Sequence, residues 1–256
     1  MIDVFTPTIR HEGIRIIADC LERQIYKDFR WIIVDHDYNI NWFTKNIPFS
    51  LWRKTLYLRP KIQRPERKYK LWNTRNTGYQ FLERPLVVEI QDYHWFRSDT
   101  LIRLATAFEK NQKSIVSAYY KIVTFKNFES AHRRDNIDDI DLEIIDETAR
   151  AHVQNKIVHG GYTMYEMNVS SMPLEFLLRH TPVDEDMDNG YLIDTHYFSI
   201  PAVHEKYDIL IDGEAKVYSF EHKLFEKRPD GWRTDGERNQ AFLKEKYKNI
   251  FPERNI

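Results

Sequence analysis

Near the start of the chain, the spacing of apolar residues is first that of a strand, then that of a helix, and then that of a strand again. Residues 2–6 predict a strand that ends at Pro7, because proline lacks the N–H that strand pairing uses. A helix reaching Gln24 is predicted by apolar residues at helical spacing, which are Ile14, Ile17, Ala18 and Leu21. Residues 31–34 predict a second strand. The result is a βαβ unit, whose ligands collect at the carboxyl ends of its parallel strands.

The same alternation continues to about residue 123. Strands are predicted over residues 55–58, 86–91 and 114–123, and a helix over residues 69–82. A further amphipathic helix is marked by Leu101, Leu104, Ala105 and Phe108. Strands that alternate with helices predict an α/β fold with a largely parallel sheet.

The second half of the chain is less regular. Residues 135–147 are acidic and are interpreted as a surface loop or helix, since they lack the spacing of a calcium loop. Gly160-Gly161 predicts either a turn or a close approach of the backbone to a substrate. A short helix is predicted around Leu174, a hairpin over residues 207–217 at Asp212-Gly213, and a closing helix over residues 239–247.

Composition narrows the class of protein. With 256 residues, 42% hydrophobic and 14% aromatic, the chain suits one large α/β domain. The 38 basic and 39 acidic residues nearly cancel, so no overall field favours DNA or an anionic bilayer. The lone Cys20 falls on the apolar face of a predicted helix and is expected to be a core thiol. Without a signal sequence or an apolar span, the protein is expected to be cytoplasmic, with no integral membrane segment.

One basic stretch has two interpretations. Residues 53–75 carry many lysines and arginines, opposed only by Glu66. They either face a diphosphate or a nucleic-acid backbone, or form a solvated surface.

The most informative stretch combines a helix with the strand that follows it. Arg75-Asn76-Thr77-Gly78 lies on the helical pattern, and an apolar strand then leads into Gln91-Asp92. A strand whose carboxyl end presents an aspartate in an open crevice suits a metal ligand for a phosphate-bearing substrate. Asp35 ends the second strand in the same way. This arrangement suggests nucleotide-sugar chemistry.

These residues resemble the family 2 glycosyltransferases of the GT-A fold, over residues 2–247. The matching motifs are Pro7-Thr8 with Arg10, Gln24-Ile25-Tyr26-Lys27-Asp28-Phe29, Asp35 after its strand, Arg75-Asn76-Thr77-Gly78, and Gln91-Asp92 in place of Asp-x-Asp. The resemblance implies a single Rossmann-like domain with a mixed, mostly parallel sheet flanked by helices. Residues 1–110 would form its nucleotide-sugar-binding half, and residues 111–256 the half with the acceptor site, the catalytic base and the C-terminal helix.

The resemblance also implies roles for individual residues. Asp35, with Pro7, Thr8 and Arg10, would hold the nucleoside, while Arg75, Asn76, Gln91 and Asp92 would bind the donor around its diphosphate. Asp92 and His222 would hold a divalent metal, Mn²⁺ or Mg²⁺, with His94 and His204 as alternative ligands. The first aspartate of Asp-x-Asp is missing here, which puts full activity in question.

Asp184-Glu185 and Gly190-Tyr191-Leu192-Ile193-Asp194 resemble the family's Asp-Glu and Gly-x-x-Glu-Asp motifs. Asp194 would therefore be the general base of an inverting, metal-dependent transfer from a nucleoside-diphosphate sugar, with UDP as the expected nucleotide. The transferred group would be a hexosyl or pentosyl unit, and the acceptor a glycan, another hydroxyl or a modified nucleic acid. The alternative role of Asp194 is an N-cap of a helix that begins at Thr195.

Two other classes of function stay open at this point. An inactive GT-A module that binds glycans or nucleotides would explain the incomplete Asp-x-Asp motif. A nucleotidyltransferase is disfavoured, because no glycine-rich loop with a lysine follows the first strand.

Overall fold

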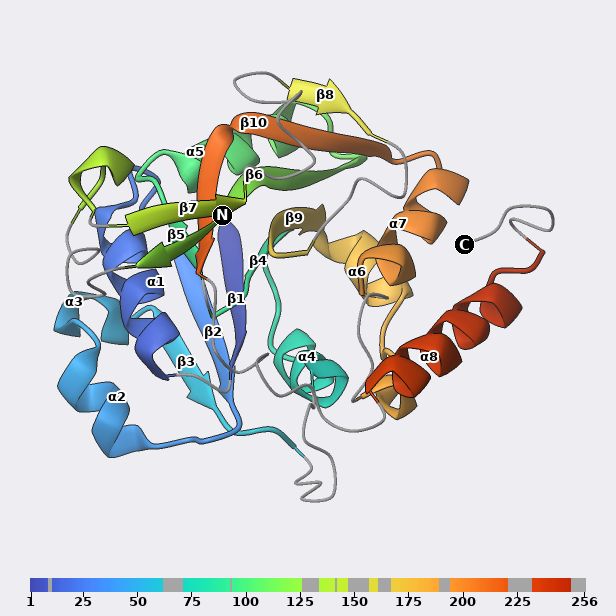
Figure 1. Cartoon of the computed structure of the whole chain (residues 1–256), viewed down its shortest axis with the longest axis horizontal. Helices are drawn as coiled ribbons and strands as arrows, with labels where there is room; N and C mark the ends of the chain where they lie inside the picture. Colours follow the sequence, from blue (N-terminus) through green and yellow to red (C-terminus); the bar gives the residue numbers. More distant parts are fainter. Residues whose placement is uncertain are drawn as a thin grey trace.

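The computed structural model describes residues 1–8, 11–61, 71–92, 94–125, 134–140, 142–146, 157–160, 167–188, 194–220 and 232–249. For residues 12, 120–125, 142–146, 194, 195, 220 and 232–236 it describes the backbone alone. Strands and helices form an α/β fold in which a twisted sheet runs between two groups of helices (Figure 1). The predicted fold class is confirmed.

Within the described residues the strands form one mixed sheet, in the order β3-β2-β1-β4-β9-β6-β10-β5, with β7 beside β6 and β8 beside β10. The strands are β1 Ile2–Thr8, β2 Phe29–Asp35, β3 Thr55–Leu58, β4 Leu86–Ile90, β5 His94–Phe96, β6 Ser114–Phe125, β7 Leu142–Asp146, β8 Ile157–His159, β9 Val169–Pro173 and β10 Asp208–Phe220. The longest ladders are parallel, with seven residue pairs between β1 and β2 and ten between β6 and β10. The mostly parallel sheet that the sequence predicts is therefore present.

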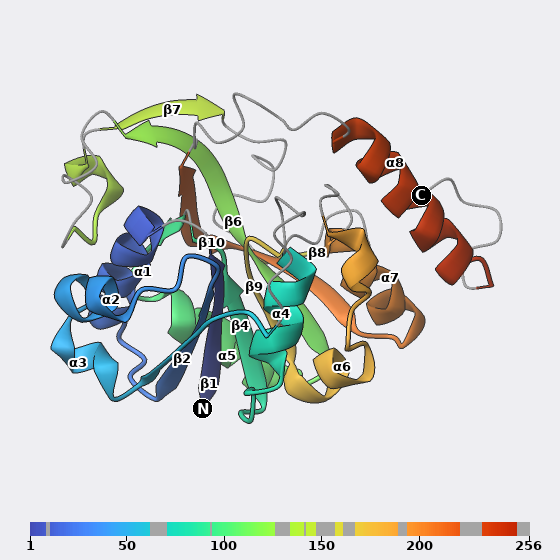
Figure 2. The ribbon, with the colours of Figure 1, turned by 90° about the horizontal axis from the view of Figure 1, so that it is seen from below.

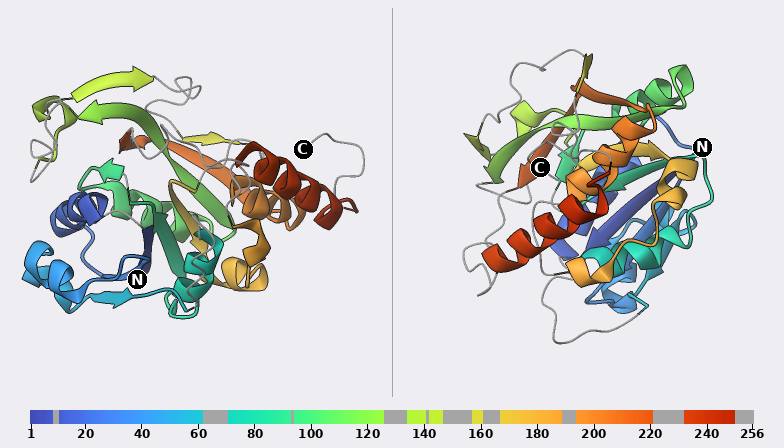
Figure 3. Two further views of the ribbon diagram at one scale, coloured as in Figure 1. Left: turned by 60° about the horizontal axis from the view of Figure 1, so that its bottom comes forward. Right: turned by 90° about the vertical axis from the view of Figure 1, so that its right-hand side faces the viewer.

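Helices cover both faces of this sheet. They are α1 His11–Arg23, α2 Ile40–Asn46, α3 Phe49–Trp52, α4 Leu71–Tyr79, α5 Thr100–Lys110, α6 Leu174–Arg179, α7 Asp194–His204 and α8 Trp232–Lys246. Helices α1–α3 and helix α8 lie at opposite ends of the molecule (Figure 3). Along the part of the chain that is described, no helix has the length and apolar character needed to cross a membrane.

Alternation along the central strands divides the apolar residues between two cores. Val4, Trp31 and Val88 belong to the core that also contains buried residues of α1, α2, α3 and α5. Phe5 and Val87, their neighbours along the chain, belong to the core with α4, α6, α7 and α8. Strand side chains point alternately to opposite faces, so continuous apolar runs are needed where both faces are covered.

A predicted strand end and a predicted turn are both absent. Strand β1 continues through Pro7 to Thr8, and Pro7 is tolerated because pairing with β4 stops at Phe5. The predicted hairpin at Asp212-Gly213 is wrong, since these residues lie inside the single long strand β10. Asp212 Oδ1 accepts hydrogen bonds from the N–H groups of Glu214 and Ala215 at 2.9 and 3.2 Å, where the register with β6 shifts. The motif makes a bulge in place of a turn.

The acidic stretch is also more ordered than predicted. It contains a 3₁₀ turn over Ile137–Asp139 and then strand β7, which pairs with β6. Asp135 accepts hydrogen bonds from the backbone N–H and the hydroxyl of Ser98, at 2.8 and 2.6 Å. A loop or helix was expected here, and pairing with β6 makes part of it a strand.

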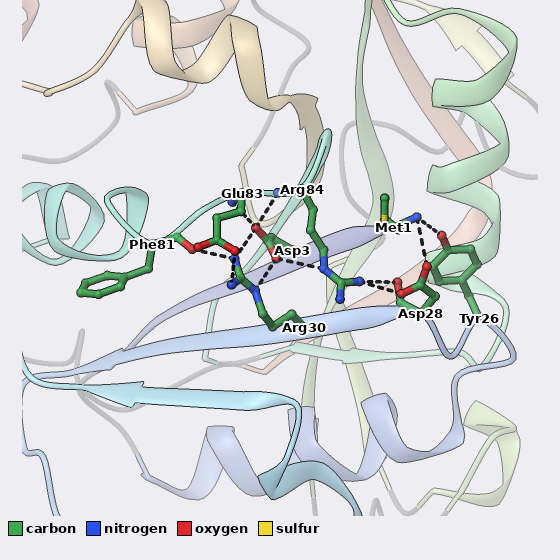
Figure 4. Close-up of polar contacts among 8 residues, drawn as sticks. All are labelled: Met1, Asp3, Tyr26, Asp28, Arg30, Phe81, Glu83 and Arg84. Atoms are coloured by element: carbon green, nitrogen blue, oxygen red, sulfur yellow. Dashed lines mark hydrogen bonds and ion pairs between the residues drawn. The ribbon is translucent and has the colours of Figure 1, made fainter.

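A buried carboxylate ties together the amino ends of the first strands (Figure 4). Asp3 is fully buried on β1 and accepts two hydrogen bonds from Arg30 of β2, each at 2.9 Å. The backbone N–H groups of Glu83 and Arg84, just before β4, donate to its Oδ2 at 2.7 and 3.0 Å. These contacts fix the end of the sheet opposite the strand ends where ligands are expected.

Candidate functional site

Three residues predicted to bind the donor lie at the carboxyl ends of three neighbouring parallel strands. Thr8 ends β1, Asp35 ends β2 directly opposite it in the register, and Asp92 follows β4. The hydroxyl of Thr8 donates a 2.7 Å hydrogen bond to Asp92 Oδ2. In open α/β sheets this edge is where ligands bind. The fold thus brings Thr8, Asp35 and Asp92 to one place.

Asp35 is held by side chains that the sequence analysis missed. Its Oδ2 accepts a hydrogen bond from the hydroxyl of Tyr57 and lies 2.8 Å from His11 Nε2, while the N–H of Asp37 donates to Oδ1 at 2.9 Å. Burial, with the Asp35 carboxylate beside the hydroxyl, raises the pKa of Tyr57 and keeps this donor protonated. The sequence predicts the strand over residues 55–58 that carries Tyr57, but not its place beside β2.

Stacked rings surround this carboxylate. The rings of His11 and Trp42 stack at 4.3 Å between centroids, and those of Tyr38 and Tyr57 at 4.7 Å. The guanidinium of Arg59 lies 5.0 Å from the centre of the Tyr38 ring. Flat aromatic surfaces next to a carboxylate acceptor suit a planar heterocycle that carries an N–H donor.

The backbone at Asp92 is fixed by close packing against helix α1. A Cβ on Gly13 would lie 1.4 Å from the carbonyl oxygen of Asp92, so only glycine fits there. The N–H of Gln91 donates to the carbonyl of Asn168 at 3.1 Å. Gln91 and Asp92 are only 8% and 2% exposed, so both residues are buried just after the carboxyl end of β4.

The metal ligands predicted from the resemblance are only partly described. Among the described residues, no group of three or more His, Cys, Asp and Glu side chains is arranged to hold a metal ion. The carboxylate oxygens of Asp92 are of the hard donor type that Mn²⁺ and Mg²⁺ prefer, so this residue fits such an ion. His94 is fully buried with its Nδ1 3.2 Å from the Gln91 carbonyl, and His204 is the exposed last residue of α7. His222 lies outside the described residues.

The Arg75-Asn76-Thr77-Gly78 motif packs into the interior of the protein. Arg75 is fully buried and forms an ion pair with Glu89 of β4, with Nη2 2.6 Å from Oε1. Tyr79 donates to the same carboxylate at 2.9 Å. A Cβ on Gly78 would lie 2.1 Å from the ring of Phe5 on β1. The motif thereby holds α4 closely against the central strands.

Asn76 joins α4 to the segment that carries the Asp-Glu motif. Its amide donates to the Val183 carbonyl at 2.8 Å and to Glu185 Oε1 at 2.9 Å, and its Oδ1 accepts from the Val183 N–H at 2.8 Å. Asn73 donates to Glu185 Oε2 at 3.0 Å, and Lys61 Nζ lies 3.1 Å from Oε1. Burial opposes ionisation of Glu185, yet these donors lower its pKa below the ordinary value. Glu185 is a fixed, ionised carboxylate at neutral pH.

Helix α7 begins at Asp194, one residue before the predicted start. Only the backbone of Asp194 is described, so the structure locates the predicted base at the start of α7 and leaves its two predicted roles untested. Arg10 lies outside the described residues, as do residues 62–70 of the basic stretch and Gly161.

No protein-family model and no curated protein sequence matches the chain. Solved structures do match it. TarS from S. aureus superposes with a TM-score of 0.63 at 10% identity, over 97% of this chain and 40% of that one. TarS 1-349 in complex with UDP-GlcNAc has a TM-score of 0.63 at 10% identity, over 97% of this chain and 66% of that one. GalNAc-T7 with UDP, GalNAc and Mn²⁺ superposes with a TM-score of 0.66 at 10% identity, over 96% of this chain and 48% of that one.

The chain spans less than two thirds of the length of each of these proteins. At 10% identity the similarity concerns the fold, which is the GT-A glycosyltransferase fold. The fold implied by the sequence motifs is confirmed.

Proposed function

We propose that the chain is a glycosyltransferase that uses a nucleoside-diphosphate sugar, with UDP as its nucleotide. The observation that carries the proposal is the buried contact of Thr8 with Asp92, beside Asp35, at the carboxyl ends of β1, β4 and β2. The GT-A fold supports it, as do structural neighbours whose structures contain UDP, UDP-GlcNAc and Mn²⁺.

The donor residues have separate tasks in this proposal. Asp35 accepts a hydrogen bond from the base, with Pro7, Thr8 and Arg10 lining the nucleoside. Gln91 and Asp92 face the diphosphate. Arg75 and Asn76 contribute to the donor site by holding α4 against Glu89 and Glu185. Their buried partners favour this positioning role over direct contact with the diphosphate.

The proposed cofactor is a divalent metal, Mn²⁺ or Mg²⁺, with Asp92 and His222 as its protein ligands. When bound, such an ion neutralises charge on a leaving diphosphate. Asp92 is suited to this task because its Oδ2 is oriented by the hydroxyl of Thr8.

Asp194 is the proposed general base. An inverting transfer needs a carboxylate that removes the proton of the acceptor hydroxyl as the new bond forms on the face opposite the diphosphate. The transferred sugar would be a hexosyl or pentosyl unit. The acceptor would be a glycan, another hydroxyl compound or a modified nucleic acid.

Replacing the base tests this mechanism. The Asp194→Asn variant is expected to lose about 10²–10⁴-fold in kcat while its affinity for UDP stays unchanged, because only proton acceptance is removed. Turnover is measured with a panel of UDP-sugars and hydroxyl acceptors, and UDP binding by calorimetry. Transfer at the wild-type rate would rule out Asp194 as the base.

Replacing Asp92 tests the donor site. The Asp92→Ala variant is expected to lose the increase in UDP affinity that Mn²⁺ produces, whereas Asp139→Ala, an exposed carboxylate in another part of the chain, keeps it. Calorimetry with and without Mn²⁺ measures both. Metal-linked binding in the wild type without transfer or hydrolysis of any UDP-sugar would favour an inactive nucleotide-binding module.

A further inference from the structure

A pocket of about 500 Å³ opens where the Asp-Glu segment, α4, α7 and α8 meet. Figures 1 and 2 show α8 beside α7 at the end of the molecule away from α1–α3. We call it the α7–α8 pocket, and its lining includes Lys61, Asp184, Glu185, Tyr197, Phe242 and Lys246. Its volume lies within the range of about 300–1,000 Å³ that is typical of small-molecule sites.

One side of the α7–α8 pocket presents fixed acceptors. Glu185 is held by Asn76, Asn73 and Lys61, and its lowered pKa keeps it ionised. Asp184 accepts from the N–H of Asp186 through Oδ1 at 2.9 Å, a local contact that orients its carboxylate at the pocket edge. Both carboxylates are therefore preorganised acceptors.

The other side combines rings with an ammonium group. Lys246 Nζ donates to the hydroxyl of Tyr197 at 2.6 Å and lies 4.0 Å from the centre of the same ring. Among the described residues, no carboxylate lies within 4.0 Å of this ammonium group. Burial lowers the pKa of Lys246, although Asp184 opposes the shift. Phe242, one turn earlier on α8, adds a partly exposed apolar ring.

This lining discriminates between classes of ligand. Two lysines and two carboxylates leave no net charge, and the carboxylates would repel a phosphate or a sulfate. An uncharged sugar has hydroxyls that both donate and accept hydrogen bonds. The carboxylates would accept from them, the ammonium group would donate to them, and the apolar C–H face would rest on a ring.

We propose that the α7–α8 pocket binds a carbohydrate. Tyr197 lies one turn after Asp194 on α7, so the pocket adjoins the start of the helix that carries the proposed base. In the proposed transferase the bound sugar would be part of the acceptor glycan. This second step rests on the proposed function, whereas sugar binding itself does not.

Direct titration tests the pocket. The probes are N-acetylglucosamine, galactose, cellobiose and lactose, added to the protein without UDP or metal and followed by saturation-transfer NMR and calorimetry. At least one probe is expected to bind with a dissociation constant of the order of 1 mM. Lys246→Met and Phe242→Ala should weaken it at least tenfold. Lys244→Met, an exposed lysine of the same helix outside the pocket, should leave it within twofold.

Lys246→Met keeps the length of the side chain and leaves the core intact, so its result stands even if Phe242→Ala is unstable. Failure of every sugar to bind the wild type, or equal binding by Lys246→Met, would overturn the proposal. So would Lys246-dependent binding of inorganic phosphate without any sugar binding.

Sugar binding by a protein that transfers nothing would support the pocket and refute the proposed enzyme. Transfer that is insensitive to Lys246→Met would refute the acceptor role of the pocket.

Discussion

Arg75 lies in a motif that resembles one of the glycosyltransferases, and yet its side chain is part of the core. Its guanidinium is fully buried against Glu89 and lies 4.9 Å from the centre of the Trp72 ring. Removing one partner of a buried ion pair leaves the other charge uncompensated, at a cost of about 3–5 kcal/mol. The Arg75→Met variant is therefore expected to be destabilised by that amount, as measured by urea unfolding.

A second substitution separates this explanation from a donor-binding role. In the Arg75→Met/Glu89→Gln double variant the unpaired charge is gone, so most of the lost stability should return. A single variant as stable as the wild type, with weaker UDP binding, would instead place Arg75 on the diphosphate.

The strand-end residues could be predicted from the sequence, and their partners could not. Thr8, Asp35 and Asp92 each follow an apolar run, and parallel strands bring such positions together. His11 and Tyr57 reach Asp35 only because α1 and β3 pack beside β2, which no local pattern encodes. Asn76 and Asp184-Glu185 were named from the sequence, but the α7–α8 pocket that they line was missed, since the lining residues come from five separate segments.

Helix α4 depends on the absence of a side chain at Gly78. A methyl group there would lie 2.1 Å from the ring of Phe5, and overpacking of this kind costs about 1–3 kcal/mol. Gly78→Ala is expected to lower stability by that amount in thermal or urea unfolding. Phe5→Leu should recover part of the loss when it is combined with Gly78→Ala. Unchanged stability in the single variant would mean that α4 can shift away from β1 freely.

The elements that the sequence did not predict are those with weak apolar patterns. Strand β9 lies between β4 and β6, yet Ser170 and Ser171 occupy its centre. Strand β5 has three residues and gains its order from pairing with β10. Helix α2 had a usable signal, because Asn39 caps it by accepting from the N–H of Trp42. The prediction of a hairpin at Asp212 was wrong because a bulge and a turn favour the same residue types.

The two predicted halves of the chain share one sheet. Strand β4 of residues 1–110 pairs with β9, and strand β5 pairs with β10, both from residues 111–256. Both cores also contain residues from both halves. The halves therefore describe a division of tasks in the proposed enzyme, and neither has a complete core of its own.

Unfolding of the whole molecule tests this shared architecture. Because each half completes the sheet of the other, the chain is expected to unfold in one transition, with coincident far-UV and near-UV circular dichroism curves in urea. Fragments 1–110 and 111–256 should each lack a cooperative transition, since the division exposes the paired edges of β4 and β10 and opens both cores. Two separated transitions, or a fragment that folds alone, would show that the halves are independent domains. Each half would then be stable without the strand pairing that joins them.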